Sequence, residues 1–352
     1  MMPANLYISS FKWTIKLILF VIGICFIVYL VGEYFESIAL KNKTMSYTIA
    51  RFQEFYELEE NTLDMVFIGS SHSYCSFDPE IFDEALEINS FQLGTPLQHP
   101  DTSYFVLREV LNYQKPSIVV FEIYWDMLDE PFNLRQVDMF FEALDNDALK
   151  EAYIHEVFPL NEKVKYYIKA IRYQGDFFAY YNQRISEWLN RNEIIEDIDL
   201  IKEQIGTEFY RSKGYVVADY VITRAKMEEE NQFNGFDGRQ WMPHPNQLEY
   251  IDKFIQLSIE NDIEVILVTA PVANISMERI ENYDYIHKKI SRLTEGYELP
   301  YIDYNIVNVD EGIFVNEHFR DDAHLNHQGA EVLNDHFIRW GVENELFDRV
   351  LN

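Results

Sequence analysis

The sequence predicts an α/β protein in which helices cover both faces of a parallel sheet, giving three layers. Short apolar segments at 64–69, 117–125 and 263–271 have almost no polar face, as expected of strands buried on both sides. Amphipathic segments of helical length alternate with these strands along the chain. Strands and helices that alternate in this way favour a parallel sheet with helical crossovers.

The remaining elements complete this alternation. Pro100 and Asp101 mark the start of a helix, because proline and acidic residues are favoured in a first helical turn. Further strands are expected at 85–94 and 299–304. Further helices are expected at 44–60, 248–262 and 280–293, with a final helix from about His327.

Five regions follow from these patterns. They are a cytoplasmic tail at 1–12, a transmembrane helix at 13–32, a stalk or first helix at 33–60, an α/β domain formed by 61–129 and 246–352, and a mostly helical insertion at 130–245. The insertion interrupts the alternation, and its segment 163–189 has the spacing of apolar residues that is typical of helices.

The N-terminal apolar segment is interpreted as a membrane anchor. Residues 17–32 carry no charge, and with the four preceding residues they reach about 20 residues, enough to cross a bilayer. Lys12 and Lys16 precede the run and Glu33 follows it, which favours a cytoplasmic N-terminus. A cleaved signal peptide or a buried helix are the alternatives; the segment after the run lacks a clean small-x-small cleavage site.

Composition excludes several classes of protein. The 29 Lys and Arg residues against 59 Asp and Glu residues give a formal net charge of −30, which disfavours nucleic-acid binding. Hydrophobic residues make up 48% of the chain, too many for a disordered protein. Only Cys25 and Cys75 are present, so neither a disulfide framework nor a thiolate zinc cluster is available.

The first chemical motif follows the strand at 64–69, where Gly69, Ser70, Ser71 and His72 come in succession. Ligands of open parallel sheets gather outside the carboxyl ends of the strands, so a nucleophile is expected there. A serine just after such a turn can expose its hydroxyl, and its own N–H can point at an oxyanion. A purely structural turn is the alternative for this motif alone.

The second motif lies near the C-terminus, in the segment 321–329. Asp321 and His324 are three residues apart, so the carboxylate can orient the imidazole through one ring nitrogen. The other nitrogen is then left to take a proton from a serine. A solvated turn is the alternative for this motif alone, but together the two motifs predict a triad of Ser71, His324 and Asp321.

These motifs resemble those of the SGNH (GDSL-type) hydrolases. Gly69-Ser70-Ser71 is similar to that family's first block, and the segment 321–324 is similar to its last, Asp-x-x-His. Gly94 corresponds to the glycine of the second block, whereas the third block, Gly-x-Asn-Asp, is absent and the strand at 117–125 runs into Tyr124 instead. The resemblance implies a flavodoxin-like three-layer fold.

The resemblance also implies roles. Ser71 is the expected nucleophile, His324 the general base and then acid, and Asp321 the residue that holds the imidazole tautomer. The backbone N–H groups of Ser71 and Gly94 are the expected oxyanion donors, with Tyr124 as a further candidate for oxyanion or substrate binding. No cofactor and no metal are expected.

A Gly-Ser-Ser version with an N-terminal anchor resembles the membrane-tethered branch of the family, which includes the teichoic-acid D-alanyl transfer protein and the alginate acetylation proteins. The expectation is a single-pass bacterial membrane protein whose extracytoplasmic domain is an esterase or O-acyltransferase. It would act on acyl groups of a cell-surface polysaccharide or related polymer, beside a membrane-bound O-acyltransferase. Tyr210, Tyr215 and Trp241 of the insertion are candidates for lining a glycan groove.

Three alternatives remain open from the sequence. A metal site is one, with the candidate ligands His318, Asp321, Asp322, His324 and His327. A second is Cys75 as the nucleophile, although no nearby basic run lowers its pKa. The third is a catalytically degenerate fold that binds a polymer or serves as a scaffold for the acyltransferase, which the missing third block favours.

Overall fold

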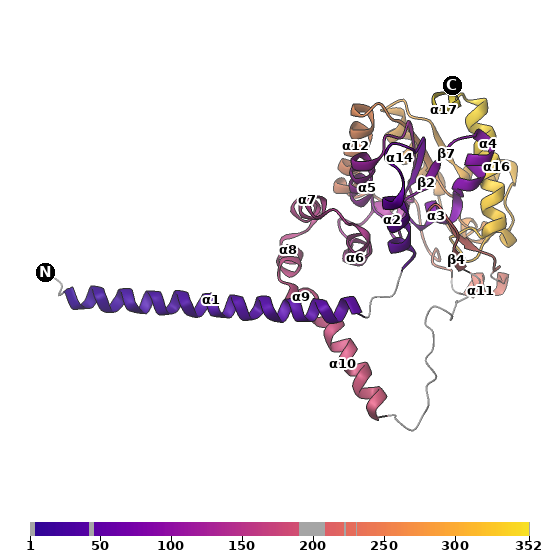
Figure 1. Cartoon of the computed structure of the whole chain (residues 1–352). Helices are drawn as coiled ribbons and strands as arrows, with labels where there is room; N and C mark the ends of the chain where they lie inside the picture. The colour runs from indigo at the N-terminus through magenta and orange to yellow at the C-terminus, as the bar shows by residue number, and fades with distance from the viewer. Residues whose placement is uncertain (1–3, 42–45, 190–207, 222, 230, 352) are drawn as a thin grey trace. The chain divides into compact units, whose positions relative to one another are not determined.

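The computed structural model describes residues 4–41, 46–189, 208–221, 223–229 and 231–351 (Figure 1). The chain divides into two units. One comprises residues 1–45 and 154–200, and the other comprises residues 46–153 and 201–352. The boundary between the two units at residues 153 and 154 falls within helix α7 (Asp147–Val157).

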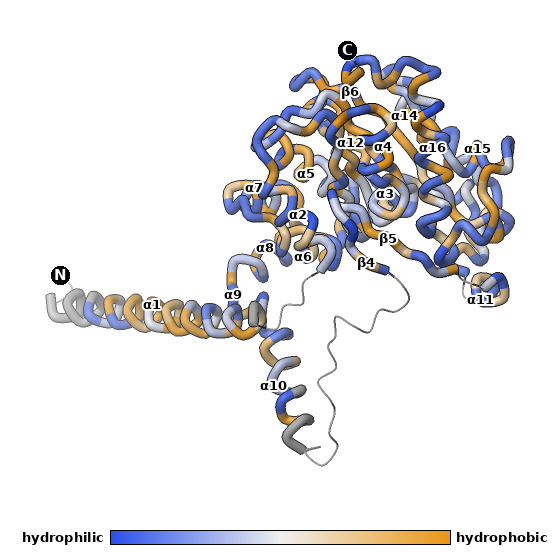
Figure 2. The backbone as a smooth tube through the Cα atoms, turned by 45° about the vertical axis from the view of Figure 1, so that its right-hand side comes forward, coloured by the Kyte–Doolittle hydropathy of each residue, from blue (hydrophilic) through white to orange (hydrophobic). Residues whose placement is uncertain are grey.

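The first unit is helical. Its elements are α1 (Ala4–Lys41), α8 (Leu160–Tyr167), α9 (Lys169–Arg172) and α10 (Gln174–Leu189). Within the described residues, Lys12–Ala39 of α1 is the one stretch long and apolar enough to cross a membrane. Figure 2 shows the hydrophobic middle of α1, whose apolar side chains are mostly exposed. Such exposure is unusual for a helix in water and is expected of one that faces lipid.

The second unit contains a five-stranded parallel sheet, which confirms the predicted fold class. Its strand order is β2-β1-β3-β6-β7, the flavodoxin-like order 2-1-3-4-5. The strands are β1 (Met65–Ile68), β2 (Ser90–Gln92), β3 (Ile118–Glu122), β6 (Glu264–Thr269) and β7 (Tyr301–Asp303). Every residue of β1 and β3 is buried, because helices lie on both faces.

Helices cover the sheet on two sides (Figure 1). The first side carries α5 (Pro100–Tyr113) and α12 (Pro245–Glu260), which pack against each other, and the right-handed crossover rule places α14 (Tyr283–Glu295) with them. The opposite side carries α3 (Ser71–Ser76), α4 (Pro79–Leu86) and α16 (His327–Glu343). The rest are α2 (Tyr47–Glu57), η1 (Trp125–Leu128), α6 (Leu134–Ala143), α11 (Arg224–Glu229), α13 (Asn274–Met277), α15 (Tyr304–Glu311), η2 (Asn316–His318) and α17 (Asp348–Leu351).

Aromatic side chains join these layers. Phe67 of β1 packs against Phe77 and Phe82 on one side of the sheet, with ring centroids 5.2 and 4.8 Å away. On the other side Phe121 of β3 stacks on Phe254 of α12 at 4.1 Å. The alternation of side chains along the strands therefore builds a core on each face.

The predicted strand at 85–94 is wrong in its first half. Asp78 caps α4, Pro79 occupies its first turn, and the helix continues to Leu86 before Glu87 ends it in the left-handed conformation. Only Ser90–Gln92 forms β2. Helices α3 and α4 were not predicted, because with six and eight residues they are too short to show a clear helical periodicity.

A small hairpin from the predicted insertion docks on the sheet edge. Its strands are β4 (Glu208–Tyr210) and β5 (Val216–Ala218), which pair antiparallel. At its tip the Lys213 carbonyl accepts the N–H of Gln92, and the Gly214 carbonyl accepts a hydrogen bond from the buried Arg51. Gly214 has φ +85°, and a Cβ there would lie 1.9 Å from the Gln92 carbonyl oxygen.

Gly214→Ala is therefore expected to destabilise the protein strongly. The added methyl group meets backbone rather than a flexible side chain, so the hairpin must shift, and we expect a loss of about 3 kcal/mol. Gly235→Ala is the matched control, since Gly235 also has positive φ (+78°) but open space around it, and should lose only about 1 kcal/mol. Urea unfolding of the detergent-solubilised chain measures both; equal losses would contradict the close contact.

Candidate active site

Ser71 stands at the start of a helix just beyond β1. The strand ends at Ile68, Ser70 is the N-cap, and Ser71 is the first residue of α3. The first N–H groups of a helix have no partner within it. Among the described residues, no hydrogen bond is found for the Ser71 N–H. The Ser71 amide is therefore available to a ligand.

The two serines of the motif have different partners. The Ser70 hydroxyl donates to Glu122 Oε2 at 2.8 Å and accepts the N–H of His72, so it is engaged in holding the turn. The Ser71 hydroxyl oxygen instead lies 2.8 Å from His324 Nε2. Of the two, Ser71 has the geometry of an activated nucleophile.

The second motif forms a closed loop whose hydrogen bonds orient His324. Phe319 and Leu325 form an antiparallel bridge at its base. Within the loop Asp321 Oδ1 accepts the N–H groups of Ala323 (2.8 Å) and His324 (2.7 Å). His324 Nδ1 lies 3.0 Å from both carboxylate oxygens of Asp321. The carboxylate therefore selects the tautomer that leaves Nε2 facing Ser71.

Asp321 is held ionised by its neighbours. Burial would raise its pKa, but the charge and hydrogen bond of His324, together with the charge of Arg320, outweigh burial and keep that pKa well below its usual range. The Arg320 guanidinium lies 3.8 Å from Asp321 and forms an ion pair of 3.0 Å with Glu208 of β4. The hairpin thus contributes, through Arg320, to the electrostatics of the site.

An aromatic stack supports the His324 ring. His72 lies between His324 and Tyr124, with ring centroids 4.5 and 3.8 Å away. Burial and, secondarily, the neighbouring His324 lower the pKa of His72 well below its usual value. His72 is therefore neutral and can pack against an imidazolium at His324 without charge repulsion.

A small cavity of about 70 Å³ opens beside the nucleophile. It is lined by Ser70, Ser71, His72, Leu97, Tyr124, Asp126, Met127, Gln232, Ala323 and His324. The Tyr124 hydroxyl is buried and has no hydrogen-bond partner among the described residues. Burial, then the charges of Asp129 and Glu130, raise the pKa of Asp126 to about 6.

The expected oxyanion role of Gly94 needs correction. Its N–H donates to Gln92 Oε1 at 2.8 Å, inside the protein. In this conformation the amide is not available to an oxyanion. Gly94 lies two residues beyond β2, and the sequence could not show that the Gln92 side chain folds back on its amide.

Glu122 is a site residue that the sequence analysis missed. It ends β3, is buried, and accepts both the N–H (2.9 Å) and the hydroxyl (2.8 Å) of Ser70 through Oε2. Its Oε1 has no partner among the described residues. Burial raises the pKa of Glu122 to about 7, although the bonds from Ser70 oppose the change. The signal was present as a single carboxylate at the end of an apolar strand.

The alternative nucleophile is disfavoured by its surroundings. Cys75 is buried, and burial raises the pKa of its thiol to about 12, so it is not a thiolate at neutral pH.

Two of the residues expected to line a glycan groove lie elsewhere in the structure. Tyr215 and Trp241 are buried in the core, with 1% and 4% of their surface exposed, and cannot line a groove.

Of the proposed metal ligands, Asp321 and His324 bind each other, and others have separate partners. Asp322 accepts the N–H of Gln232, and His327 Nδ1 lies 3.2 Å from the Tyr215 hydroxyl. Within the part of the chain that the structure describes, no three His, Cys, Asp or Glu side chains are grouped to hold a metal ion.

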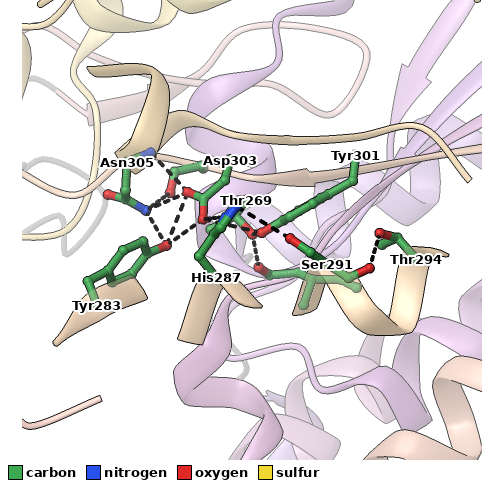
Figure 3. A network of polar contacts seen from close by, with 10 residues as sticks. Thr269, Tyr283, His287, Ser291, Thr294, Tyr301, Asp303 and Asn305 are labelled. Carbon is green, nitrogen blue, oxygen red and sulfur yellow. Dashed lines mark hydrogen bonds and ion pairs between the residues drawn. The ribbon is translucent and has the colours of Figure 1, made fainter. Parts of the chain in front are cut away.

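A second Ser-His-Asp arrangement joins α14 to the end of β7 (Figure 3). His287 Nδ1 lies 2.9 Å from Asp303, and the Ser291 hydroxyl lies 3.4 Å from His287 Nε2. Ser291 is inside α14, where its N–H belongs to the helical hydrogen bonds and cannot serve an oxyanion. Asp303 also accepts from Tyr283 and caps α15, so this network joins elements of the fold.

Comparison with solved structures finds distant similarity. A candidate acylhydrolase from Bacteroides fragilis is 13% identical (TM-score 0.39), the match covering 88% of this chain and all of that one. A GDSL-like lipase from Bacteroides thetaiotaomicron is 12% identical (TM-score 0.38), and the match covers 85% of this chain and all of that one. A candidate platelet activating factor from Streptococcus pneumoniae is 10% identical (TM-score 0.39), and the match covers 91% of this chain and 98% of that one. No protein-family model matches the sequence, and no curated protein matches it. Values this low assign no activity, which has to be inferred from the site.

Glu122→Gln is expected to change how stability depends on pH. The pKa of Glu122 is about 7 in the folded chain and 4.5 in an exposed carboxyl group. Above pH 7 the ionised side chain therefore lowers the free energy of unfolding. This destabilisation decreases as the pH falls from 7 to 4.5 and is absent below 4.5. The variant should therefore gain about 3 kcal/mol relative to the native chain at about pH 8, and less than about 1 kcal/mol at about pH 5.

Urea unfolding at the two pH values measures this difference. Any cost of the amide itself is independent of pH and cancels in the comparison. An identical effect of Glu122→Gln at both pH values would contradict a raised pKa.

Proposed function

We propose that the chain is an SGNH-like serine esterase or O-acyltransferase that acts through Ser71, His324 and Asp321. The observation that carries this proposal is the pair of contacts of His324. Its Nε2 lies 2.8 Å from the Ser71 hydroxyl, and its Nδ1 lies 3.0 Å from Asp321. These are the contacts that a general base needs on its two nitrogens.

The reaction proceeds in two steps. Ser71 Oγ attacks the acyl carbon of an ester while its proton passes to His324 Nε2; the C–O bond to the leaving alcohol then breaks, and the leaving oxygen takes the proton from His324. In the second step a water or an acceptor hydroxyl gives its proton to His324 and attacks the acyl carbon; the bond to Ser71 Oγ then breaks, and His324 returns the proton to Oγ. Asp321 stabilises the imidazolium in both steps.

Oxyanion stabilisation is assigned to two groups of the cavity. The Ser71 N–H is available because it begins α3, and the Tyr124 hydroxyl is buried beside the cavity and has no hydrogen-bond partner in the described part of the chain. The pKa of Tyr124 is raised well above its usual value, by burial and then by nearby carboxylates, so the hydroxyl keeps its proton and can donate it. Gly94 is left out of this set, and no cofactor takes part.

The substrate is an acyl ester of a cell-surface polysaccharide or related polymer. A cavity of about 70 Å³ favours a short acyl group such as acetyl over a fatty chain. The net charge of −30 disfavours phosphate-rich polymers and favours a neutral or acetylated glycan. Helix α1 anchors the chain with its C-terminal part outside the cytoplasm, where a membrane-bound O-acyltransferase can supply acyl groups at high effective concentration.

Substitution in the triad tests the chemistry. Ser71→Ala and His324→Ala should each reduce cleavage of a small activated acyl ester by at least about a thousandfold, because triad members act as a unit. Asp321→Asn should also be severe, since the imidazole loses its orienting acceptor. The full chain in detergent is assayed for release of the alcohol, and Cys75→Ser serves as a control that should stay near the native rate.

A fluorophosphonate probe provides a second readout. It should label Ser71 in the native chain and fail to label Ser71→Ala. If the native chain were never labelled while Ser71→Ala still bound glycan, a polymer-binding or scaffold role would replace the enzymatic one. The absence of a Gly-x-Asn-Asp block and the engaged Gly94 amide are the features that favour that second role.

The proposed membrane topology has its own test. Lys12 and Lys16 precede the uncharged run, so a reporter that is active only outside the cytoplasm should be active when fused after Asn352. A cytoplasmic reporter at the same position should be silent. The reverse pattern would contradict the extracytoplasmic site and, with it, a surface-polymer substrate.

A further inference from the structure

Two helices of the insertion segment pack on the C-terminal end of α1 (Figure 1). Gly32 permits the close approach, since a Cβ there would lie 2.8 Å from both the Ala170 backbone nitrogen and Lys169 Cβ. The Lys169 ammonium lies 2.9 Å from Glu33 and 2.5 Å from Glu36. These contacts attach α9 to α1 through both shape and charge.

Aromatic contacts attach α10 to the same end of α1. Phe35 stacks on Phe177 with ring centroids 4.1 Å apart. The hydroxyl groups of Tyr34 and Tyr181 lie 2.8 Å apart. All these partners on α1 fall at 32–36, from the last residue of the uncharged run 17–32 onward. If α1 crosses a bilayer, α9 and the start of α10 lie at the level of the lipid headgroups.

The same helices expose apolar side chains in stripes. On α8 Leu160, Val164 and Tyr167 are exposed at positions i, i+4 and i+7, which form one face. On α10 the side chains of Phe178 and Ile185 are more than half exposed, and they lie one helical turn before and after Tyr181. The Tyr181 ring contacts Phe177, the residue whose ring stacks on Phe35 of α1. The exposed stripe of α10 is therefore continuous with the contact to the apolar helix.

The charge of this segment differs from that of the chain. Residues 160–189 hold five lysines and arginines and three acidic residues, a net charge of +2, whereas the whole chain carries −30. A helix that lies in a membrane interface typically combines an apolar face containing aromatic residues with basic residues on the polar side. Anionic headgroups therefore attract this segment and repel most of the remaining surface.

We propose that α8, α9 and α10 form a membrane-surface platform, with the stripes of α8 and α10 set into the outer headgroup region of an anionic phospholipid bilayer. The proposal rests on the membrane anchoring by α1 proposed above. Lipid is favoured over a protein partner because the stripe of α10 begins where the spanning run ends, and because Phe178 and Tyr181 are residue types that suit the boundary between acyl chains and water.

Single-cysteine labelling of the full chain tests this platform. In a Cys25→Ser, Cys75→Ser background, Phe178→Cys and Asp176→Cys receive an environment-sensitive fluorophore, and each protein is placed at one copy per nanodisc of phosphatidylcholine and phosphatidylglycerol. Asp176 is the matched control because it is exposed on the opposite side of α10. A lipid spin-labelled near its headgroup should quench the label at Phe178→Cys several-fold more than that at Asp176→Cys. Ile185→Cys should repeat the result.

Native Cys25 separates failure of the platform from failure of the anchor. It lies in the middle of the uncharged run, so a label on it, in a Cys75→Ser chain, should be quenched by a lipid spin-labelled deep in the acyl chain. Quenching at Cys25 with equal, weak quenching at Phe178→Cys and Asp176→Cys would overturn the platform alone. No quenching at Cys25 would overturn the anchor and the platform together. A shielded label at Phe178→Cys that no lipid quenches would assign the stripe to a protein partner or a second copy.

Discussion

The candidate active site depends on one hydrogen bond between residues 253 positions apart, from the Ser71 hydroxyl to His324. The strand order explains how they meet. β1 is the second strand of the sheet and lies between β2 and β3; the direction of the crossovers changes between β1 and β3, and ligand sites of open α/β sheets form at this point. The loop that carries His324 is closed by its own hydrogen bonds, so it presents the imidazole to β1 in an orientation that Asp321 already determines.

Buried ionisable groups surround this contact, and burial disfavours the charged form of each. It keeps His72 neutral and Tyr124 protonated, and it brings the pKa of Glu122 close to neutrality. Asp321 is the exception, because His324 and Arg320 outweigh its burial and keep it ionised. The site therefore concentrates negative charge on the carboxylate that faces the imidazole, the arrangement that best stabilises an imidazolium.

The helical unit serves a different physical requirement. Helix α1 exposes an apolar surface that water does not stabilise, and α9 and α10 attach to it by an ion pair, a stacked ring pair and a close approach at Gly32. The proposed membrane would cover both the exposed run and the stripes of α8 and α10. Tethering at a membrane would raise the effective concentration of a surface polymer for the α/β unit, which favours acyl transfer at the envelope over digestion of soluble esters.

The sequence by itself determined the alternation of strands and helices, the apolar N-terminal helix, and the two motifs that contain Ser71, Asp321 and His324, because periodicity and short-range spacing are local properties. Tertiary structure decided which hydroxyl and which amide are available. Ser70 is engaged by Glu122, and the Gly94 amide by the Gln92 side chain; neither follows from spacing, since a hydrogen-bond partner is known only when the chain has folded. The extent of β2 was decided in the same way, because the helix that begins at the Asp78 cap and packs on α16 continues to Leu86, and the chain becomes a strand only at Ser90.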